Sequence, residues 1–492
     1  MHWPIIRRCL SEYDRVAIRD DRGETAAWKV VAGAMHIRSA VRRVCNSKTV
    51  GLLIPTSGAF PVAALGAWMA GKVIVPLNYL LKQEDLQFVV DDCEADTIIA
   101  SGVLLEHLGF RPRVKNLLIL EEMDFKRLPA PAIPARARGD DLACLLYTSG
   151  TSGRPKGVML THANLKANVG QCVEWVGFEG SQHSMLGVLP QFHTFGLTVL
   201  TLLPLMTGLP VTYTARFMPT RILALMREQR PTVFVAIPSM YGALLNLKSA
   251  KPEDFASLQI AVSGGEPLPR SIFEGFRDRY NITINEGYGL TETAPVINWC
   301  RPGEWRSGSV GMPLPRVRER ICDINTGQEV PQGEEGEIRV KGPNVMRGYF
   351  KRDEDTAAAF DDDAWFRTGD IGRFDEQGHL YITGRLKEML IVGGENVFPR
   401  EIEEVLNQHA SVNASGVVGL QDDIRGEVPV AFVELVEGAE FSEEALRAHC
   451  RQHLAGYKVP RDIRVLEALP RNPTGKIMRK ELKKMLAESA KA

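Results

Sequence analysis

A short stretch of small and polar residues between two apolar runs constrains this chain more than any other feature. Residues 148–157 read TSGTSGRPKG, with three glycines, four hydroxyl side chains and the cation Lys156. The apolar runs from Ala143 to Tyr147 and from Val158 to Leu160 flank it, which predicts a strand, a loop and a second strand. Because the loop has almost no apolar side chain to bury, it cannot form part of a core.

The composition of this loop suits the binding of a polyphosphate. Glycine lets backbone N–H groups converge on an anion, and Ser and Thr hydroxyls donate further hydrogen bonds. We expect such contacts from Thr148, Ser149, Gly150, Thr151, Ser152, Gly153 and Lys156. A Walker A loop is disfavoured, because that motif needs Gly-Lys-Ser/Thr at the start of a helix and here Lys156 precedes Gly157. A flexible surface loop without a ligand stays open from these residues alone.

The bulk properties describe a globular protein with more than one domain. A length of 492 residues exceeds what one ordinary core holds. The net charge of −1 gives no general attraction to nucleic acid or to anionic lipid, and we expect no nucleic-acid partner. The eight cysteines are scattered without a C-x-x-C pair, which indicates reduced thiols rather than a metal site or a disulfide framework. We therefore expect a cytoplasmic protein.

The sequence predicts no signal peptide and no transmembrane segment. The first residues, MHWPIIRRCLSEYDR, lack the apolar stretch of a signal peptide. Residues 186–214 carry no charged side chain, but Pro190, Pro204 and Pro210 interrupt them and no basic flank marks an orientation. A buried strand-turn-helix region explains this stretch better.

The first half of the chain alternates strands with helices. Val50 to Pro55 and Lys72 to Pro76 are apolar and strand-like, and Phe60 to Ala70 between them has helical spacing. The alternation recurs from Pro219 to Val262 and ends at the turn 263–265, Ser-Gly-Gly. This pattern predicts an α/β fold with parallel sheets, whose ligands lie at the carboxyl ends of the strands.

The second half has a different character. Residues 311–348 are rich in glycine, proline and charge, which predicts a small β subdomain. We place the main boundary between residues 386 and 387, dividing a large domain, 1–386, from a small α+β domain, 387–492. The tail after Met478 has the pattern of a basic amphipathic helix, and we expect it to be a solvated end.

A second glycine-rich motif, NEGYGLTET, occupies residues 285–293. Its tyrosine stands between two glycines and presents an aromatic face with backbone close by, which suits stacking against a purine. Glu292 is a hard oxygen donor able to hold Mg²⁺ between phosphates, and Thr291 can donate to a phosphate oxygen. A tight turn with a surface carboxylate explains the same residues.

Three further polar residues carry chemistry of their own. Asp370 follows a glycine in WFRTGD, and a carboxylate can accept hydrogen bonds from both hydroxyls of a ribose. Lys476, in PRNPTGKI, lies on a turn that two prolines restrict, where one cation could offset the repulsion between two joining anions. A surface ion pair and a surface lysine are the ordinary alternatives. His193 lies among aromatic residues and is either a buried core residue or part of a pocket.

Together these motifs resemble the adenylate-forming enzymes, a family that includes acyl-CoA synthetases, the adenylation domains of peptide synthetases and beetle luciferases. The motifs follow in the family's order from the 148–157 loop to Lys476. The resemblance implies that the loop binds the phosphates of ATP and that Glu292 binds Mg²⁺. It implies an adenine and ribose site formed by Gly264, Gly265, Glu266, Gly287, Tyr288, Gly289, Asp370 and Arg385.

The same resemblance assigns catalytic and mobile residues. The implied catalytic residues are Lys476, Glu292, Thr291 and His193. Lys387 matches the position of a hinge about which the small domain rotates, and the rotation brings Gly393 and Gly394 to a pantetheine tunnel.

The expected acid is a fatty acid. Residues 191–214 contain no carboxylate that could pair with the ammonium of an amino acid. The region instead holds the apolar residues Leu197, Val199, Leu200, Leu202, Leu203, Leu205 and Met206, which either line an alkyl pocket or fill the core. The motif wording, such as PQFHTFGLT and KGPNVMRGYF, is similar to bacterial fatty acyl-CoA ligases and acyl-carrier-protein synthetases.

We therefore expect a two-step ligase. A medium- or long-chain fatty acid and ATP would give acyl-adenylate and pyrophosphate, and the thiol of CoA would then give a thioester and AMP. Acyl carrier protein is the alternative acceptor, since either anion could meet the basic residues Arg400, Arg425, Arg451, Lys458, Arg461, Arg464 and Arg471. A catalytically silent acyl or nucleotide sensor is a rival of another class, which the joint presence of Lys476, Glu292 and Asp370 disfavours.

Overall fold

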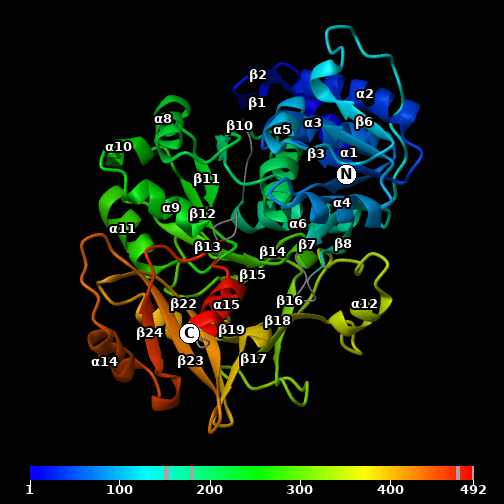
Figure 1. Cartoon of the computed structure of the whole chain (residues 1–492). Coiled ribbons are helices and arrows are strands. Elements are labelled where there is room, and N and C mark those ends of the chain that lie inside the picture. Colours follow the sequence, from blue (N-terminus) through cyan, green and yellow to red (C-terminus); the bar gives the residue numbers. More distant parts are fainter. Residues whose placement is uncertain (149–153, 178–181, 472–476, 490–492) are drawn as a thin grey trace.

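Parallel β-α-β units build the first sheet of the computed structural model, which describes residues 1–148, 154–177, 182–471 and 477–489 (Figure 1). The strand order is β6-β5-β3-β4-β7-β8, and every pair is parallel except β7 with β8. The strands are β3 (Thr49–Leu53), β4 (Val73–Pro76), β5 (Thr97–Ala100), β6 (Asn116–Ile119), β7 (Leu142–Thr148) and β8 (Lys156–Thr161). Their helices are α3 (Ala59–Met69), α4 (Gln83–Asp92), α5 (Gly102–Leu108) and α6 (His162–Val176). The predicted strand-helix-strand unit is confirmed.

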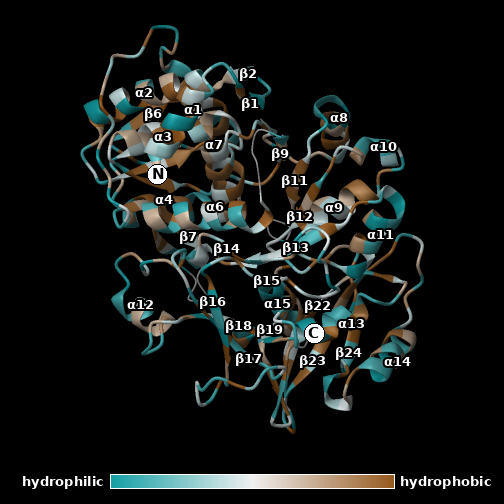
Figure 2. Cartoon of the chain, turned by 180° about the vertical axis from the view of Figure 1, so that it is seen from behind, coloured by the Kyte–Doolittle hydropathy of each residue, from teal (hydrophilic) through white to brown (hydrophobic). Residues whose placement is uncertain are grey.

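A nine-stranded sheet forms the second layer, in the order β15-β14-β13-β12-β11-β9-β10-β1-β2. Its strands are β1 (Val16–Asp20), β2 (Gly23–Ala26), β9 (Met185–Gly187), β10 (Val211–Tyr213), β11 (Val233–Ala236), β12 (Ile260–Ser263), β13 (Ile284–Gly289), β14 (Val296–Trp299) and β15 (Met312–Pro313). The helices around it are α1 (His2–Ser11), α2 (Ala27–Val44), α8 (Pro219–Gln229), α9 (Pro238–Leu245), α10 (Pro252–Phe255) and α11 (Arg270–Tyr280). The middle strands are parallel, as the alternation predicts, and β11 and β12 are apolar along their length (Figure 2).

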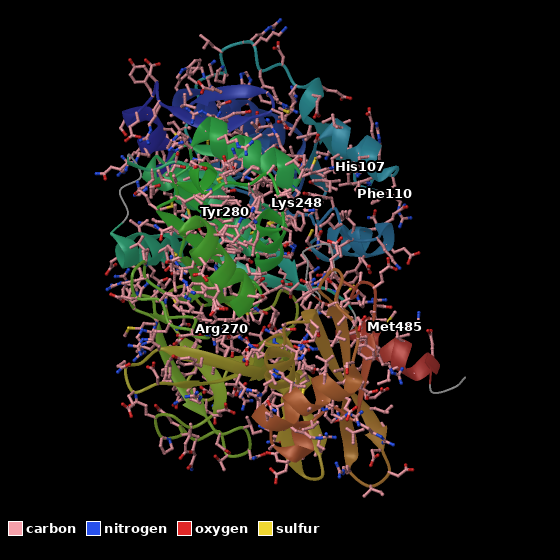
Figure 3. All side chains as sticks on the ribbon, turned by 90° about the vertical axis from the view of Figure 1, so that its left-hand side faces the viewer. His107, Phe110, Lys248, Arg270, Tyr280 and Met485 are labelled. Carbon is pink, nitrogen blue, oxygen red and sulfur yellow. The ribbon has the colours of Figure 1, made fainter. Side chains whose placement is uncertain are left out.

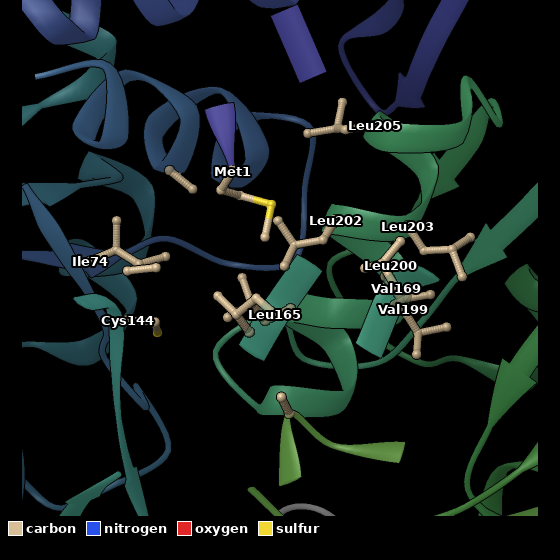
Figure 4. Packing of buried hydrophobic residues seen from close by; sticks show 14 of the residues in the cluster. Met1, Ile74, Cys144, Leu165, Val169, Val199, Leu200, Leu202, Leu203 and Leu205 are labelled. Carbon is tan, nitrogen blue, oxygen red and sulfur yellow. The ribbon is translucent and has the colours of Figure 1, made fainter. Parts of the chain in front are cut away.

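The uncharged stretch at residues 186–214 is buried inside this domain, as the sequence predicts. It forms the π-helix η3 (Gly196–Leu202) and α7 (Leu203–Thr207), which run between β9 and β10. Leu165 and Val169 of α6 lie beside Leu200 and Leu202 of this region (Figure 4). Within the described residues, no helix has both the length and the apolar character needed to cross a membrane.

An antiparallel four-stranded sheet forms the predicted β subdomain. Its order follows the chain: β16 (Arg318–Cys322), β17 (Gly336–Lys341), β18 (Phe366–Phe374) and β19 (Leu380–Arg385). Helix α12 (Asp353–Ala359) lies between β17 and β18 in the chain and contacts β18. The short 3-10 helix η5 (Leu386–Glu388) follows β19, and η4 (Thr291–Thr293) contacts β8.

The described residues of the smaller C-terminal domain form a five-stranded sheet with three α-helices and the 3-10 helix η6 (Gly456–Lys458). Its elements are β20 (Leu390–Val392), β21 (Glu395–Val397), α13 (Pro399–Leu406), β22 (Val412–Asp422), β23 (Gly426–Leu435), α14 (Glu443–His453), β24 (Asp462–Val465) and α15 (Arg479–Ser489). Ser442 caps α14 by accepting from the backbone N–H of Ala445. The expectation for α15 is wrong in part: Met485 is on its outer side (Figure 3), but Leu482 and Leu486 are buried against the sheet.

Candidate nucleotide and acid site

The Ser-Gly-Gly turn at residues 263–265 and the motif at residues 285–293 meet at the carboxyl ends of β12 and β13. The strands are parallel neighbours with Ser263 opposite Glu286, so the residues that follow each strand come together. A Cβ atom on Gly264 would lie 3.4 Å from the Gly287 carbonyl oxygen and 3.2 Å from the Phe195 ring. A side chain at residue 264 would crowd the Phe195 ring, so glycine suits this close approach.

A cavity of about 510 Å³ opens beside this junction and is lined by both domains. The large domain contributes Gly265, Glu266, Gly287, Tyr288, Gly289, Asp370 and Arg385, and the small domain contributes Arg400, Glu403, Arg471, Ile477 and Arg479. The structure thus brings together most of the predicted adenine and ribose residues. Arg471 and Ile477 flank residues 472–476 in the sequence, and both line the cavity. Lys476 itself lies outside the described residues, as do Ser149, Gly150, Thr151, Ser152 and Gly153.

Asp370 is the centre of the polar contacts in this cavity. It faces Arg385 across the β18–β19 ladder, and the Arg385 Nε donates to its Oδ1 at 2.6 Å. The Tyr288 hydroxyl donates to its Oδ2 at 2.7 Å. Burial and the Asp370 charge raise the pKa of Tyr288. Burial lowers the pKa of Arg385, but the Asp370 carboxylate outweighs it and the pKa is raised, so both partners stay protonated donors.

Glu292 lies in η4 with Thr291, at the end of the same β13 motif. Its Oε1 accepts from the Tyr349 hydroxyl at 2.8 Å. Burial raises the pKa of the Glu292 carboxyl, and the bond from Tyr349 opposes that rise. No group of three or more His, Cys, Asp and Glu side chains within the described ranges is placed to hold a metal ion. One carboxylate fits a Mg²⁺ ion that takes its other ligands from phosphates and water.

The cation of the first loop contacts the β subdomain. Lys156 Nζ lies 2.6 Å from Asp355 Oδ1 and 5.6 Å from the centre of the Tyr349 ring. Strand β8 is held against residues 349–350 because Val158 pairs with Tyr349 and the Phe350 N–H donates to the Gly157 carbonyl at 2.8 Å. Tyr349 therefore stands between Lys156 and Glu292. Sequence reasoning missed Tyr349 and Asp355, although the motif KGPNVMRGYF contains the tyrosine.

A separate apolar pocket of about 110 Å³ adjoins the cavity. Gly265, Gly287, Tyr288 and Gly289 line both spaces, and none of the described residues that line the pocket is charged. Its walls come from α6, η3 and the central strands: Cys172, Val176, Met185, Phe195, Val199, Leu203, Val233, Val235, Ile260, Val262, Pro295, Val296 and Trp299. Of the predicted alkyl-pocket run, Val199 and Leu203 line the pocket, whereas Leu197 and Leu200 are fully buried core residues.

His193 lies apart from both spaces. Its ring is tilted against Phe192 at 4.7 Å, and with Tyr147 it lines a much smaller cavity. Burial lowers the pKa of His193 to about 4, so the ring is neutral at pH 7. Its Nε2 atom is buried without a hydrogen-bond partner among the described residues. Phe195, two residues on, is the member of this motif that borders the apolar pocket.

The predicted hinge and tunnel residues lie on the surface. Lys387 is exposed in η5, directly after β19. Gly393 and Gly394 form the turn between β20 and β21 with φ of +62° and +92°, and a Cβ on either would meet no atom within 4 Å. Neither glycine lines the cavity. In this arrangement Arg471 and Ile477, rather than Gly393 and Gly394, share the cavity with the predicted adenine and ribose residues.

Comparison with known proteins agrees with this geometry. The AMP-binding enzyme model matches residues 26–350, and the model of the AMP-binding enzyme C-terminal domain matches residues 401–476. The chain belongs to the AMP-binding enzyme family. It is 33% identical to a feruloyl-CoA synthase of Amycolatopsis sp over 98% of both chains. It is 32% identical to a long-chain-fatty-acid–CoA ligase of Bacillus subtilis (strain 168), over 88% of this chain and 84% of the other.

Two solved structures are similar to this chain over almost its whole length. ATP-bound MatB from Rhodopseudomonas palustris has a TM-score of 0.89 and 30% sequence identity, and 99% of each chain is covered. An anthranilate CoA ligase, AuaEII, in complex with anthranoyl-AMP has a TM-score of 0.91 at 28% identity, over 99% of this chain and 98% of that one. The α/β fold, with a large parallel-sheet domain and a smaller C-terminal domain, is thus shared by both.

Proposed function

We propose that this protein is an ATP-dependent acid–CoA ligase for an apolar carboxylic acid. The observation that carries the proposal is that two unlike spaces share Gly265, Gly287, Tyr288 and Gly289 in their walls. One is a polar cavity with Asp370 and Arg385, and the other is an apolar pocket whose described lining residues carry no charge. An acid bound with its tail in the pocket would present its carboxylate at the mouth, next to a nucleotide in the cavity.

The reaction has two balanced steps. A carboxylate oxygen of the acid attacks the α-phosphorus of ATP, the bond to the bridging oxygen breaks, and pyrophosphate leaves. The thiol of CoA, after losing its proton, attacks the acyl carbon, and AMP leaves as the thioester forms. Both steps join groups that carry or develop negative charge, so cations and N–H donors near the reacting atoms lower the barriers.

We assign the residues to this reaction as follows. Asp370 accepts from the ribose hydroxyls while Arg385 and Tyr288 hold its carboxylate in place. The adenine lies between the Tyr288 ring and the backbone of residues 264–266. Lys156 and the 148–153 loop contact the phosphates, and Lys476 contacts the anions at the reacting centre. Glu292, with Thr291 beside it, would hold Mg²⁺, which when bound neutralises charge on the phosphates.

We propose a medium- or long-chain fatty acid as the substrate. The described residues that line the pocket offer no counter-ion for a second charge on the acid, and a tail of methylene groups gains about 0.8 kcal/mol for each one buried. Among the relatives, a long-chain-fatty-acid–CoA ligase and a feruloyl-CoA synthase are similarly close, so an aryl acid is the second candidate.

We propose CoA rather than a carrier protein as the acceptor, because most of the basic side chains that could dock an acidic protein are neutralised locally. Five of the seven predicted residues have carboxylate partners: Arg400 with Glu404, Lys458 with Glu401, Arg461 with Asp422, Arg464 with Asp462 and Arg471 with Glu434. A carrier protein would have to compete with these pairs for the same cations.

We further propose that the chain divides at residues 386 and 387 and that Lys387 is the hinge. Rotation there would move Lys476 away from the reacting centre and bring Gly393 and Gly394 to it before the thiol attacks.

The eight cysteines of the protein are buried and free, which supports a reducing compartment such as the cytoplasm.

The experiment that tests the function is a pyrophosphate-release screen. Saturated acids of graded length and aryl acids are offered with ATP and Mg²⁺, with CoA or holo acyl carrier protein as the acceptor. We expect pyrophosphate and AMP to form together, with the highest kcat/KM for a fatty acid and with CoA. A sensor without activity would bind ATP and release no pyrophosphate with any acid.

A further inference from the structure

A packing contact joins the small domain to the large one beside the ribose residues. Gly384 lies in β19, directly before Arg385, and Phe398 is the N-cap residue of α13. A Cβ atom on Gly384 would lie 2.5 Å from both Cγ and Cδ1 of the Phe398 ring, so the ring rests on the glycine backbone. Helix α13 also contacts β19, and the two elements lie close together in Figure 2.

The large domain contributes to the burial of Phe398, which is 8% exposed. Its neighbours Val397 and Ile402 belong to the apolar core of the small domain. Phe398 is not among the described residues that form this core. Its ring is therefore buried at the interface between the two domains rather than inside one of them.

The charged residues that follow Phe398 on α13 form ion pairs within the small domain. The pairs are Arg400 with Glu404, Glu401 with Lys458 and Glu403 with Arg479. Both partners of each pair come after residue 387, so the pairs would move with the small domain and do not tie it to the large one. The contact between Gly384 and Phe398 does tie them, because one residue lies on each side of Lys387.

We propose that Phe398 is a positioning residue, which holds the small domain in the arrangement that forms the adenylate. The described lining of the nucleotide cavity includes Gly384 and Arg385 but not Phe398, so the ring acts through the strand on which it rests. The inference depends on the proposed two-step reaction and on the proposed hinge. Rotation at Lys387 would move the ring off Gly384, and the contact would then be absent during thioester formation.

The two half-reactions, assayed separately, test this role. Phe398→Ala should slow adenylate formation by at least ~10-fold, because burying such a side chain shifts an equilibrium by ~10–100-fold. Thioester formation from pre-made acyl-adenylate should fall by less than ~3-fold or rise, since that arrangement lacks the contact. Phe398→Leu keeps an apolar side chain in place and should retain at least about a third of the wild-type rate of adenylate formation.

A measurement without catalysis follows the positions of the two domains. The eight cysteines of the chain are buried, so a donor and an acceptor dye can be attached through Leu128→Cys and Ile424→Cys, at one exposed residue in each domain. In the nucleotide-free protein, Phe398→Ala should shift the mean energy-transfer efficiency, and Phe398→Leu should leave it near the wild-type value. If Phe398→Ala does not fold, Gly384→Ala gives the same readings, because its Cβ atom would displace the ring.

The control is Phe441→Ala, which removes a partly exposed aromatic ring from the same domain, between β23 and α14. Neither half-reaction nor the transfer efficiency should change in this variant. An unchanged transfer efficiency in Phe398→Ala, equal loss of both half-reactions there, or the same losses in Phe441→Ala overturns the proposal. Wild-type protein that forms no adenylate with any acid overturns the proposed ligase instead, and the dye measurement then decides whether Phe398 holds the domains together.

Discussion

The Tyr288 hydroxyl lies 2.7 Å from Asp370 Oδ2 and links the carboxyl end of β13 to the β subdomain. The two residues are 82 positions apart in the chain, yet the contact joins the aromatic face proposed for adenine to the carboxylate proposed for ribose. Arg385 holds the other carboxylate oxygen at 2.6 Å. The carboxylate proposed to bind the ribose is therefore held in place before a nucleotide binds, which reduces the conformational entropy lost on binding.

Asp370→Asn should raise the KM for ATP by ~10–100-fold, because a hydrogen bond to a charged group is worth about 1.5–3 kcal/mol. Tyr288→Phe should raise it by less than ~10-fold, since it removes one donor and keeps the ring. The KM for the acid should stay the same in both variants. Steady-state kinetics with each substrate varied in turn measure this, and a parallel rise in the KM for the acid would contradict the ribose assignment.

Glu292 and Tyr349 should control the magnesium and pH dependence together. Glu292→Gln removes the charge, and the Mg²⁺ concentration for half-maximal activity should rise by ~10-fold or more. In Tyr349→Phe the bond that opposes the raised pKa of Glu292 is lost. The carboxyl then stays protonated to a higher pH, so the acidic limb of the activity profile should move toward higher pH. An unchanged metal titration in the first variant, or an unmoved limb in the second, would argue against a metal-binding carboxylate.

Glu286 should make the protein less stable at alkaline pH. Burial raises the pKa of its carboxyl to about 7, with the Arg400 charge opposing that rise. The native state therefore binds this proton more tightly than the unfolded chain. The stability that it contributes is present below the unfolded value of about 4.5 and is lost as pH rises through 7.

Glu286→Gln should consequently stabilise the fold above pH 7, by on the order of 3 kcal/mol at pH 8, and change little near pH 4.5. Thermal melts across this range measure the difference. The surface variant Glu274→Gln is the control and should stay within ~0.5 kcal/mol at both pH values. A gain at pH 8 that persists undiminished at acid pH would not come from this carboxyl.

Lys476→Ala and Lys387→Pro should fail in opposite half-reactions. The first should slow adenylate formation by at least ~100-fold while pre-made acyl-adenylate still reacts with CoA. The second fixes φ at the hinge, so adenylate should form while thioester formation collapses. Pyrophosphate release and thioester yield, assayed separately, distinguish the two. Loss of both steps in either variant would contradict a division of labour between two domain positions.

The parallel-sheet architecture could be predicted because its strands and helices carry clear local signals. The apolar run before residue 55 and the helical spacing that follows form the expected unit, and prolines at 219 and 238 begin two of the helices in the alternation that continues to Val262. The glycine-rich segments were predicted to bind a nucleotide through their resemblance to the family's motifs, because an ordinary loop and a tight turn explain the same residues taken alone. The structure shows that β12 and β13 are neighbouring strands, so the 263–265 turn and the 285–293 motif come together.

Contacts that depend on pairing between distant segments could not be predicted. Tyr349 reaches Lys156 and Glu292 only because β8 pairs with the segment before α12, and no local pattern signals that pairing. The burial of α15 is different, because Leu482 and Leu486 have the spacing of an apolar helix face. The many lysines of that helix obscured this signal.

The most direct test of the proposed ligase is a single-turnover reaction followed by mass spectrometry. The protein is mixed with a fatty acid, ATP and Mg²⁺ without an acceptor, and CoA is added in a second step. We expect acyl-adenylate and pyrophosphate to appear in equal amounts first, and acyl-CoA and AMP to replace the adenylate once CoA is present. Formation of ADP and phosphate, or of acyl-CoA without a preceding adenylate, would contradict the proposed chemistry.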